Sequence, residues 1–458
     1  MAASGSPGHF PVEFVCANNV PKADFVGHAD PYIYAWICSP PAGSTFAKMG
    51  DSLMALADSG SSAPAPAVSA PSPSRRSAFK KKFKPTRQFT AAEIKESKLL
   101  CAGDLVRSER IYDQKDPVWH CVRDFRIQPK ASDVLIVVMY DWDKTDADDL
   151  LASVAIPVSL LAGTGELLKV PFTLYKAKKE LNCSLTLRSL PTPNPFPTKR
   201  TFFLIRHGES QWNEAQGKKS AKGMVKTTDH GLNLVGIQQA QAFNAKWRAA
   251  ESSPRVEQWR AADQVFVSPL TRAIQTCFLT MDTHPGFFRG AIALPSLREA
   301  KNLGGLDTIG KVSGDKIRSR FISQLQKTLS AEQFAALNLG YDLDLSRCPH
   351  PWWTPAGNKE GPKTLARRIH DFVSTIQFSG SDQPVILVGH SLLFKEFVKT
   401  HLSEAFKAAQ PAFAAKLAAH KLGNASCLAV DVVFQDWPLP LAEIVNAELM
   451  FGGDFHYE

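Results

Sequence analysis

The chain has 458 residues, of which 44% are hydrophobic and 21% charged, a mixture typical of globular domains. Its length leaves room for two or three domains, and its net charge of +9 indicates anionic partners. No apolar run reaches the roughly 18 residues that a membrane-spanning helix needs, and the first residues lack the apolar segment of a signal peptide. The eight cysteines show neither a CxxC pair nor zinc-ligand spacing, so we expect reduced, mostly buried thiols in a cytoplasmic protein.

Residues 8–190 contain short runs rich in β-branched and aromatic residues, such as DPYIYAWIC and DVLIVVMYD. Runs of this length predict an all-β antiparallel sandwich. The region at about 41–97 interrupts the pattern. It begins with a stretch rich in Ser, Ala and Pro and continues in the basic run RRSAFKKKFKPTRQF, residues 75–89, which contains no acid. We predict that this region is a disordered basic insert.

Acidic residues cluster in particular connections of the predicted sandwich. In an antiparallel sandwich, successive connections alternate between the two ends, so the first, third and fifth connections share one end. That end is predicted to gather five carboxylates, with Asp116 nearby, from the first and fifth connections: Asp24, Asp30, Asp141, Asp143 and Asp149. Such a cluster repels itself unless a hard cation lies within it, and oxygen ligands suit Ca²⁺.

The segments DFVGHADPY, DPVW and YDWDKTDADDLLAS resemble the loop motifs of the C2 family of calcium-dependent lipid-binding domains. The resemblance covers residues 8–190 apart from the insert. It implies that Ca²⁺ bridges the aspartates to an anionic phospholipid membrane, with Phe25, Val26 and Trp142 at the interface. Ala152 departs from the glycine that usually follows the last calcium loop. An acidic loop end that binds no metal is the alternative.

The insert is predicted to lie at the end of the sandwich opposite the calcium loops. Its basic run suits the same anionic membrane surface, and a solvated linker or a localisation signal are alternatives. A second break follows at residues 191–199, where a proline-rich sequence predicts a stiff linker.

Residues 200–458 alternate between apolar strands and helical stretches, which predicts an α/β sheet covered by helices. The strand FFLI leads to Arg206 and His207, VILV leads to His390, and VFVS leads to a helix start that includes Arg272. Ligands bind outside the carboxyl ends of strands in such sheets. Two guanidinium groups and two imidazoles that meet there suit a phosphoryl group.

Five segments in order resemble the histidine phosphatase superfamily, whose fold is the phosphoglycerate-mutase-like three-layer α/β sandwich. They are RHGES followed by Trp212 and Asn213, DHGL, SPLTRAIQT, LREAKN and VGHS. The resemblance covers residues 200 to about 452.

The resemblance implies a role for each matching residue. His207 attacks phosphorus to form a phosphohistidine, and His390 assists in holding the phosphoryl oxygens. Glu299 acts as general acid and base. The remaining phosphate-binding residues that it implies are Arg206, Arg272 and Asn213. No metal is required for this chemistry. The other histidines, such as His284, His350 and His420, are expected to be ordinary surface residues.

Three readings of the function stay open. Two segments differ from those typical of the mutase branch: EAQGKKSAKGMVKTTDHG and LREAKNLGGLD. These differences favour hydrolysis of a phosphate monoester over a mutase-type phosphotransferase. The third reading is a non-catalytic calcium- and lipid-binding adaptor. We expect a phosphorylated substrate of unknown identity, calcium-dependent peripheral membrane association and no nucleic acid partner.

Overall fold

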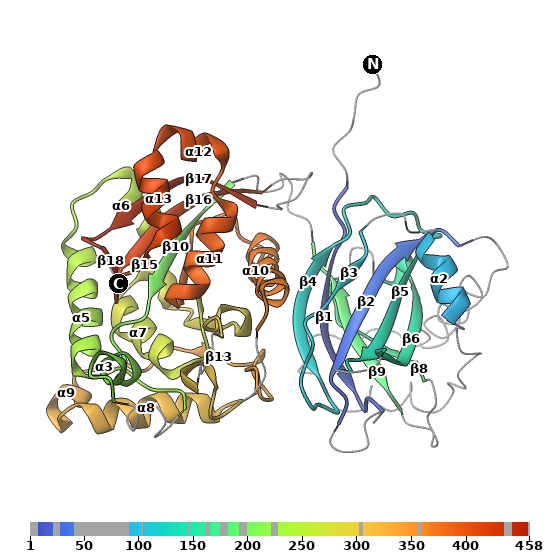
Figure 1. Cartoon of the computed structure of the whole chain (residues 1–458), viewed down its shortest axis with the longest axis horizontal. Helices are drawn as coiled ribbons and strands as arrows, with labels where there is room; N and C mark the ends of the chain where they lie inside the picture. The colour runs from blue at the N-terminus through green and yellow to red at the C-terminus, as the bar shows by residue number, and fades with distance from the viewer. Residues whose placement is uncertain are drawn as a thin grey trace, which may run out of the picture. The chain divides into compact units, whose positions relative to one another are not determined.

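A computed structural model describes residues 8–21, 28–40, 91–99, 101, 104–143, 147–161, 165–174, 182–191, 199–220, 228–301, 306–355, 360–434 and 442–456. The chain divides into two compact units, Met1–Thr192 and Pro193–Glu458. Figure 1 shows a β-rich first unit and a second unit of mixed strands and helices. No helix within the described ranges is both long and apolar enough to cross a membrane.

The first unit is an antiparallel β-sandwich, as predicted. One sheet has the order β4-β1-β9-β7 and the other β3-β2-β5-β6-β8. The strands are β1 (Pro11–Asn18), β2 (Pro31–Cys38), β3 (Val106–Arg107), β4 (Val118–Asp124), β5 (Val134–Asp141), β6 (Asp149–Pro157), β7 (Leu168–Pro171), β8 (Thr173–Leu174) and β9 (Ser184–Ser189).

Alternation along the strands sends side chains to opposite faces of each sheet. In β1, Val12 and Phe14 enter the core between the two sheets, whereas β2 also contributes Trp36 to a smaller cluster on the outer face of its sheet. That outer cluster includes Ile94 of helix α2 (Ala91–Leu99). The prediction of disorder is therefore wrong for residues 91–97. Residues 41–90 lie outside the described residues, as do residues 192–198 of the predicted linker.

The second unit is a three-layer α/β sandwich, as predicted. Its seven-stranded sheet has the order β13-β12-β11-β14-β10-β16-β17, in which β16 and β17 are antiparallel to their neighbours. The strands are β10 (Lys199–Arg206), β11 (Gln264–Val267), β12 (Ala291–Ala293), β13 (Leu343–Asp344), β14 (Val385–Gly389), β16 (Cys427–Phe434) and β17 (Ala442–Met450), and a separate pair is formed by β15 (Lys421–Leu422) and β18 (Phe455–His456).

Helices cover both faces of this sheet (Figure 1). The α-helices are α3 (Gln211–Gly217), α5 (Leu234–Ala249), α6 (Pro254–Ala261), α7 (Thr271–Met281), α8 (Lys316–Thr328), α9 (Ala331–Ala335), α10 (Pro362–Gln377), α11 (Ser391–His401), α12 (Glu404–Ala409) and α13 (Pro411–Ala419). Short 3₁₀ turns occupy Val158–Leu160, Pro285–Phe287, Pro295–Leu297 and Leu306–Thr308.

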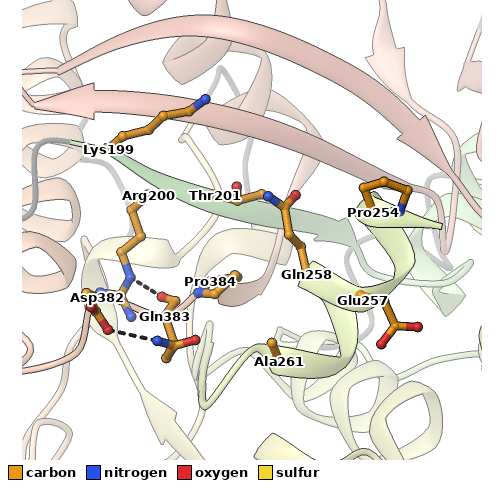
Figure 2. Close-up of a pocket in the computed structure, with 10 residues that line it drawn as sticks. All are labelled: Lys199, Arg200, Thr201, Pro254, Glu257, Gln258, Ala261, Asp382, Gln383 and Pro384. Atoms are coloured by element: carbon orange, nitrogen blue, oxygen red, sulfur yellow. Dashed lines mark hydrogen bonds between the residues drawn. The ribbon is translucent and has the colours of Figure 1, made fainter. Parts of the chain in front are cut away.

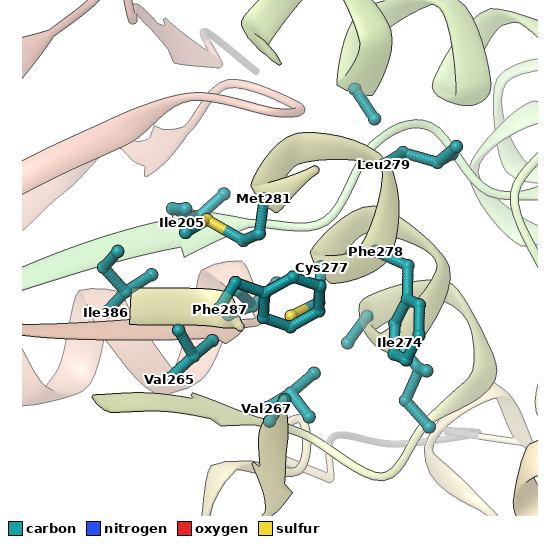
Figure 3. Packing of buried hydrophobic residues seen from close by; sticks show 14 of the residues in the cluster. Ile205, Val265, Val267, Ile274, Cys277, Phe278, Leu279, Met281, Phe287 and Ile386 are labelled. Carbon is teal, nitrogen blue, oxygen red and sulfur yellow. The ribbon is translucent and has the colours of Figure 1, made fainter. Parts of the chain in front are cut away.

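The inner strand β10 contains the apolar run Phe202–Ile205, which is buried on both faces of the sheet. Phe203 and Ile205 enter the cluster beneath α5 and α7, and Phe202 and Leu204 enter the cluster beneath α10 and α11. Figure 3 shows the first of these clusters around Ile205 and helix α7. Fully burying a side chain of this size stabilises the fold by about 1.5–3 kcal/mol. The two cores therefore fix the position of the strand end that carries Arg206.

Candidate active site

The strand ends of the second unit bring the two predicted histidines together. Strands β10 and β14 are parallel, with Arg206 opposite Gly389, so His207 and His390 follow their strands at the same edge. The backbone N–H of His207 donates to the Gly389 carbonyl at 3.0 Å. The ring centroids of His207 and His390 are 5.1 Å apart. Both rings are buried.

The hydrogen bonds of His207 define its tautomer. Its Nδ1 lies 2.7 Å from the Gly208 carbonyl oxygen, and because a carbonyl only accepts, Nδ1 carries the proton. Nε2 is left with a lone pair, to which Nε–H of Arg272 donates at 3.2 Å. Burial lowers the pKa of His207 well below its ordinary value, and the charges of Arg272 and Arg206 lower it further. The imidazole is therefore neutral, as a nucleophile requires.

Arg272 lies in the first turn of α7, as predicted from its sequence position. Its terminal nitrogens donate to Asp307, at 2.8 Å to the backbone oxygen and 3.3 Å to Oδ2. The start of α7 is held by Asp229, whose carboxylate accepts from the N–H and the hydroxyl of Thr271, each at 2.7 Å. Arg320 donates to the same carboxylate at 2.8 Å. Asp229 and Asp307 thus fix the arginine from two sides.

Two buried side-chain nitrogen atoms in the site have no hydrogen-bond partner among the described residues. They are Nε of Arg206 and Nδ1 of His390. Another nitrogen of each side chain does have a partner. Nη1 of Arg206 donates to the Leu422 carbonyl at 2.5 Å, and Nε2 of His390 lies 2.8 Å from the Ser268 hydroxyl. A buried polar group without a partner costs free energy, so these positions favour a bound acceptor such as a phosphoryl oxygen.

Glu299 follows the turn Pro295–Leu297, and its carboxylate contacts the first turn of α11. Its Oε1 accepts the N–H groups of Ala300 at 2.8 Å and of Leu393 at 3.1 Å. Burial raises the pKa of Glu299, although the positive charge of Arg272 opposes this shift. A carboxyl group with a raised pKa is suited to donate a proton near neutral pH.

A buried ion pair holds the segment that carries Glu299. Arg368 and Glu360 form two hydrogen bonds of 2.7 Å. Arg368 also donates to the carbonyls of Ser296 and Arg298. Burial alone would raise the pKa of Glu360, but Arg368 holds it at about 2.

Asn213 has a structural contact that the sequence did not indicate. Its Oδ1 accepts from the N–H of Ser210 at 3.1 Å and from the Ser210 hydroxyl at 2.8 Å, which completes a capping box at the start of α3. Its assignment to phosphate binding stays a prediction. The expectation for His284 was wrong, because His284 is fully buried with Nε2 2.9 Å from the Trp259 carbonyl oxygen.

A pocket of about 500 Å³ lies at the opposite, amino end of β10 (Figure 2). It is lined by Lys199, Arg200, Thr201, Pro254, Glu257, Gln258, Ala261, Asp382, Gln383 and Pro384. None of these is a predicted site residue. The guanidinium of Arg200 is occupied by hydrogen bonds to Gln383, Ile376, Ser379 and Gln264.

In the first unit, four of the predicted calcium ligands lie at one end of the sandwich. Asp141 is paired with Asp149 across β5 and β6, and its Oδ1 accepts the N–H of Asp30 at 2.6 Å. Asp143 follows β5, with its N–H donating to Asp148 at 3.1 Å. The connections that follow β1, precede β4 and follow β5 meet at this end, as the alternation of connections predicted.

The described residues alone do not complete a metal site. No group of three or more His, Cys, Asp or Glu within them is arranged to hold an ion, and Asp24, Phe25 and Val26 lie outside these residues. The carboxylate oxygens that do gather are nevertheless the donors that Ca²⁺ prefers, so the donor chemistry fits this ion. The ring of Trp142 is covered by the guanidinium of Arg110 at 3.6 Å.

Comparisons with known proteins agree with this two-part architecture. A family model of the C2 domain matches residues 98–170, and a model of the histidine phosphatase superfamily (branch 1) matches residues 202–310. The chain therefore contains a C2 domain followed by a histidine phosphatase superfamily domain. No curated protein matches the chain.

Solved structures resemble the two parts separately. The C2A domain of plant Extended Synaptotagmin 1 is 11% identical with a TM-score of 0.24, over 41% of this chain and 98% of that one. Human GIVD cytosolic phospholipase A2 is 17% identical with a TM-score of 0.23, over 41% of this chain but only 17% of that one. Phosphoglycerate mutase from Bacillus anthracis str. Sterne is 16% identical with a TM-score of 0.31, over 55% and 94% of the two chains.

Proposed function

We propose that the second unit hydrolyses a phosphate monoester through a phosphohistidine at His207, and that the first unit brings it to anionic membranes with calcium. The observation that carries the catalytic half is a pair of buried nitrogens near the neutral His207, Arg206 Nε and His390 Nδ1, that have no hydrogen-bond partner in the described part of the chain. Together with Arg272 they form a cradle for the oxygens of one phosphoryl group.

The reaction proceeds in two displacements. The lone pair on His207 Nε2 attacks phosphorus, and the ester P–O bond breaks as Glu299 gives its proton to the leaving oxygen. Water then attacks the phosphohistidine while Glu299 takes a proton from it, which releases inorganic phosphate and restores the imidazole. Arg206, Arg272 and His390 bind the phosphoryl oxygens in both steps.

The phosphoenzyme provides the test of the catalytic half. Wild-type protein, incubated briefly with a ³²P-labelled phosphomonoester and quenched in alkaline detergent, is expected to carry an alkali-stable label that acid removes and that His207→Ala abolishes. His456→Ala, at the exposed end of the last strand, is the matched control and is expected to be labelled normally. Equal phosphate release by wild type and His207→Ala would leave only the adaptor function.

The same experiment separates hydrolysis from mutase-type transfer. A hydrolase passes the phosphoryl group to water and releases all label as inorganic phosphate. If the label instead returned to an added alcohol or phosphoglycerate acceptor in preference to water, a phosphotransferase would be the better description.

For the first unit, Asp24, Asp30, Asp141, Asp143 and Asp149 are the residues that would hold Ca²⁺. The ion would supply positive charge that bridges these carboxylates to anionic headgroups. The convergence of Asp30, Asp141 and Asp149 at one end of the sandwich supports this proposal.

Sedimentation with phosphatidylserine vesicles tests the calcium step. The full chain is expected to sediment in calcium and to stay in solution with a chelator, and Asp143→Asn is expected to weaken calcium-dependent binding. Asp104→Asn changes the net charge equally, but Asp104 pairs with Arg126, which follows the opposite end of β4. This control is expected to bind as wild type does. Equal sedimentation with vesicles in calcium and in chelator would overturn the proposal that calcium bridges the protein to the membrane.

A further inference from the structure

Two cysteines face each other at the base of the insert. Cys38 is the last residue of β2, and Cys101 follows helix α2 by two positions. They are joined in an isolated antiparallel β-bridge. Residues directly opposite each other in an antiparallel pair have Cα atoms about 4.5–5.5 Å apart. Disulfides need about 4.4–6.8 Å, so the backbone is already at a bonding separation.

The two thiol side chains lie on the same face of the sheet. Cys38 belongs to the outer cluster formed with Trp36, Ile94 and Val134, and Cys101 packs against this cluster. Burial, with smaller contributions from the neighbouring Cys101 and Asp133, raises the pKa of Cys38 to about 12. Cys38 is fully buried whereas Cys101 is partly exposed, so a reagent from solution meets Cys101 first.

This arrangement differs from that of the other cysteines in strands. In the strand registers of the described residues, Cys16 faces Val118 and Thr186, Cys121 faces Phe14, and Cys427 faces Ile205 and Met450. No second pair of cysteines faces each other in those registers.

We propose that Cys38 and Cys101 form a reversible disulfide when the protein meets a small-molecule disulfide such as oxidised glutathione. The Cys101 thiolate attacks one sulfur of the reagent, which gives a mixed disulfide and releases the first small thiol. Cys38 then loses its proton and attacks the Cys101 sulfur, and the second small thiol leaves. Two protein thiols are oxidised and one small disulfide is reduced to two thiols.

The disulfide joins the two ends of residues 39–100, the segment that contains the basic run 75–89. It also attaches the end of α2 covalently to β2. In the reduced protein, α2 is held at this sheet by Ile94, which is buried in the outer cluster, and by Lys98, whose Nζ lies 5.1 Å from the centre of the Tyr34 ring. Oxidation therefore fixes Cys38 and Cys101, the two ends of this segment, relative to each other, and neither cysteine is a proposed site residue.

Peptide mapping of the full chain tests this directly. After equilibration with a tenfold excess of oxidised over reduced glutathione, free thiols are alkylated and the protein is digested with trypsin without reduction. The expected product is peptide 23–48 linked to peptide 99–107, each of which contains one cysteine. Reduction before digestion should remove the linked product and return both peptides. Glutathione on Cys101 with Cys38 alkylated, or a link from Cys101 to any other cysteine, would overturn the proposal.

Two variants and a second readout separate this pair from general oxidation. Cys101→Ser is expected to lose the linked product, while Cys16→Ser keeps it because Cys16 faces no cysteine. Amide hydrogen exchange of α2 in the wild type is expected to slow by about tenfold or more on oxidation, because the link opposes local opening of the helix end. Unchanged exchange despite a linked peptide would show that the bond does not restrain this segment, and would overturn that part of the proposal.

Discussion

The Ser268 hydroxyl lies 2.8 Å from His390 Nε2 and also accepts the N–H of Leu270 at 3.4 Å. In the proposed mechanism, the Ser268 hydroxyl donates its proton to Nε2. His390 is then protonated at Nδ1, the buried nitrogen that has no partner in the described part of the chain. Ser268 thereby orients a donor toward the phosphoryl oxygen.

Ser268→Ala is expected to lower kcat/KM by about 10- to 100-fold. The substitution leaves His390 Nε2 without its hydrogen-bond partner, so the proton is no longer held on Nδ1. Steady-state kinetics and ¹⁵N spectra of labelled histidine measure the two effects. The matched control is Ser296→Ala, because the buried Ser296 hydroxyl has no hydrogen-bond partner among the described residues. Loss of activity without a change in the His390 tautomer would contradict the orienting role.

Glu299 sets the expected pH dependence. Burial raises its pKa, so the carboxyl stays protonated to higher pH than an exposed glutamate, and kcat/KM should fall as pH rises through this pKa. His207 is already neutral across this range because its pKa lies well below the ordinary value.

Glu299→Gln is expected to remove the alkaline limb and to lower kcat/KM, which reports the first displacement, by about 10²- to 10⁴-fold for an alkyl phosphate. For 4-nitrophenyl phosphate, whose leaving group needs no proton, the loss in the first displacement should be much smaller. A pH–rate profile with both substrates measures this, and equal losses for both would argue against a proton donor.

The sequence predicted the residues that end strands or begin helices. Arg206, His207, Arg272 and His390 are identifiable because each follows an apolar strand, and the sheet brings such positions to one edge. Ser268 and Asp307 were missed as site residues, because nothing about a serine or aspartate in isolation tells which side chain it contacts. These contacts depend on the register between β11 and β14 and on the return of residues 306–308 to α7.

At the level of elements, the first turn of α5 packs against the loop that follows His207. A Cβ atom on Gly236 would lie 2.0 Å from the Glu209 carbonyl oxygen, and one on Gly208 would lie 2.5 Å from the Gly236 carbonyl oxygen. Both separations are far below van der Waals contact. The approach of helix to loop therefore requires glycine on each side, and it holds in place the backbone that follows His207.

Gly236→Ala is expected to lower kcat/KM by about 10-fold or more, because the loop must move and small displacements of reacting groups are costly. Gly217→Ala is the control, since a Cβ there meets nothing within 4 Å. Enzyme kinetics and circular dichroism of both variants give the measurement. Full activity of Gly236→Ala would show that the loop tolerates the shift.

Elements with a clear hydrophobic pattern in the sequence were predictable, whereas helix α2 was not. Strand β10 is buried on both faces, so its apolar run stood out in the sequence. Helix α2 has the sequence AAEIKESKL, in which Ile94 alone is a fully buried apolar residue among those described. Its position is determined by contact with Trp36 and Ile136 on the outer face of a sheet, and no local periodicity reports that contact.

At the level of the whole molecule, each hydrophobic cluster of the described residues lies within one unit. Two clusters contain residues of the first unit, and two contain residues of the second unit. The proposed calcium ligands and the phosphate cradle likewise come from different units. Composition and motifs were enough to predict this division, because each part has its own secondary-structure pattern.

Separate cores predict separate unfolding transitions, each sensitive to its own ligand. A ligand at 100 times its dissociation constant stabilises the unit that binds it by about 2.7 kcal/mol, which raises the Tm of a unit of this size by several degrees. Calcium is therefore expected to raise the Tm of the first unit's calorimetric transition. Orthovanadate, which mimics the phosphoryl group, is expected to raise the Tm of the second unit's transition. Asp143→Asn should remove the calcium shift alone, and His390→Ala should weaken the vanadate shift alone. A single transition that both ligands raise would show that the two units unfold together, and a calcium shift that survives Asp143→Asn would argue against this residue as a ligand.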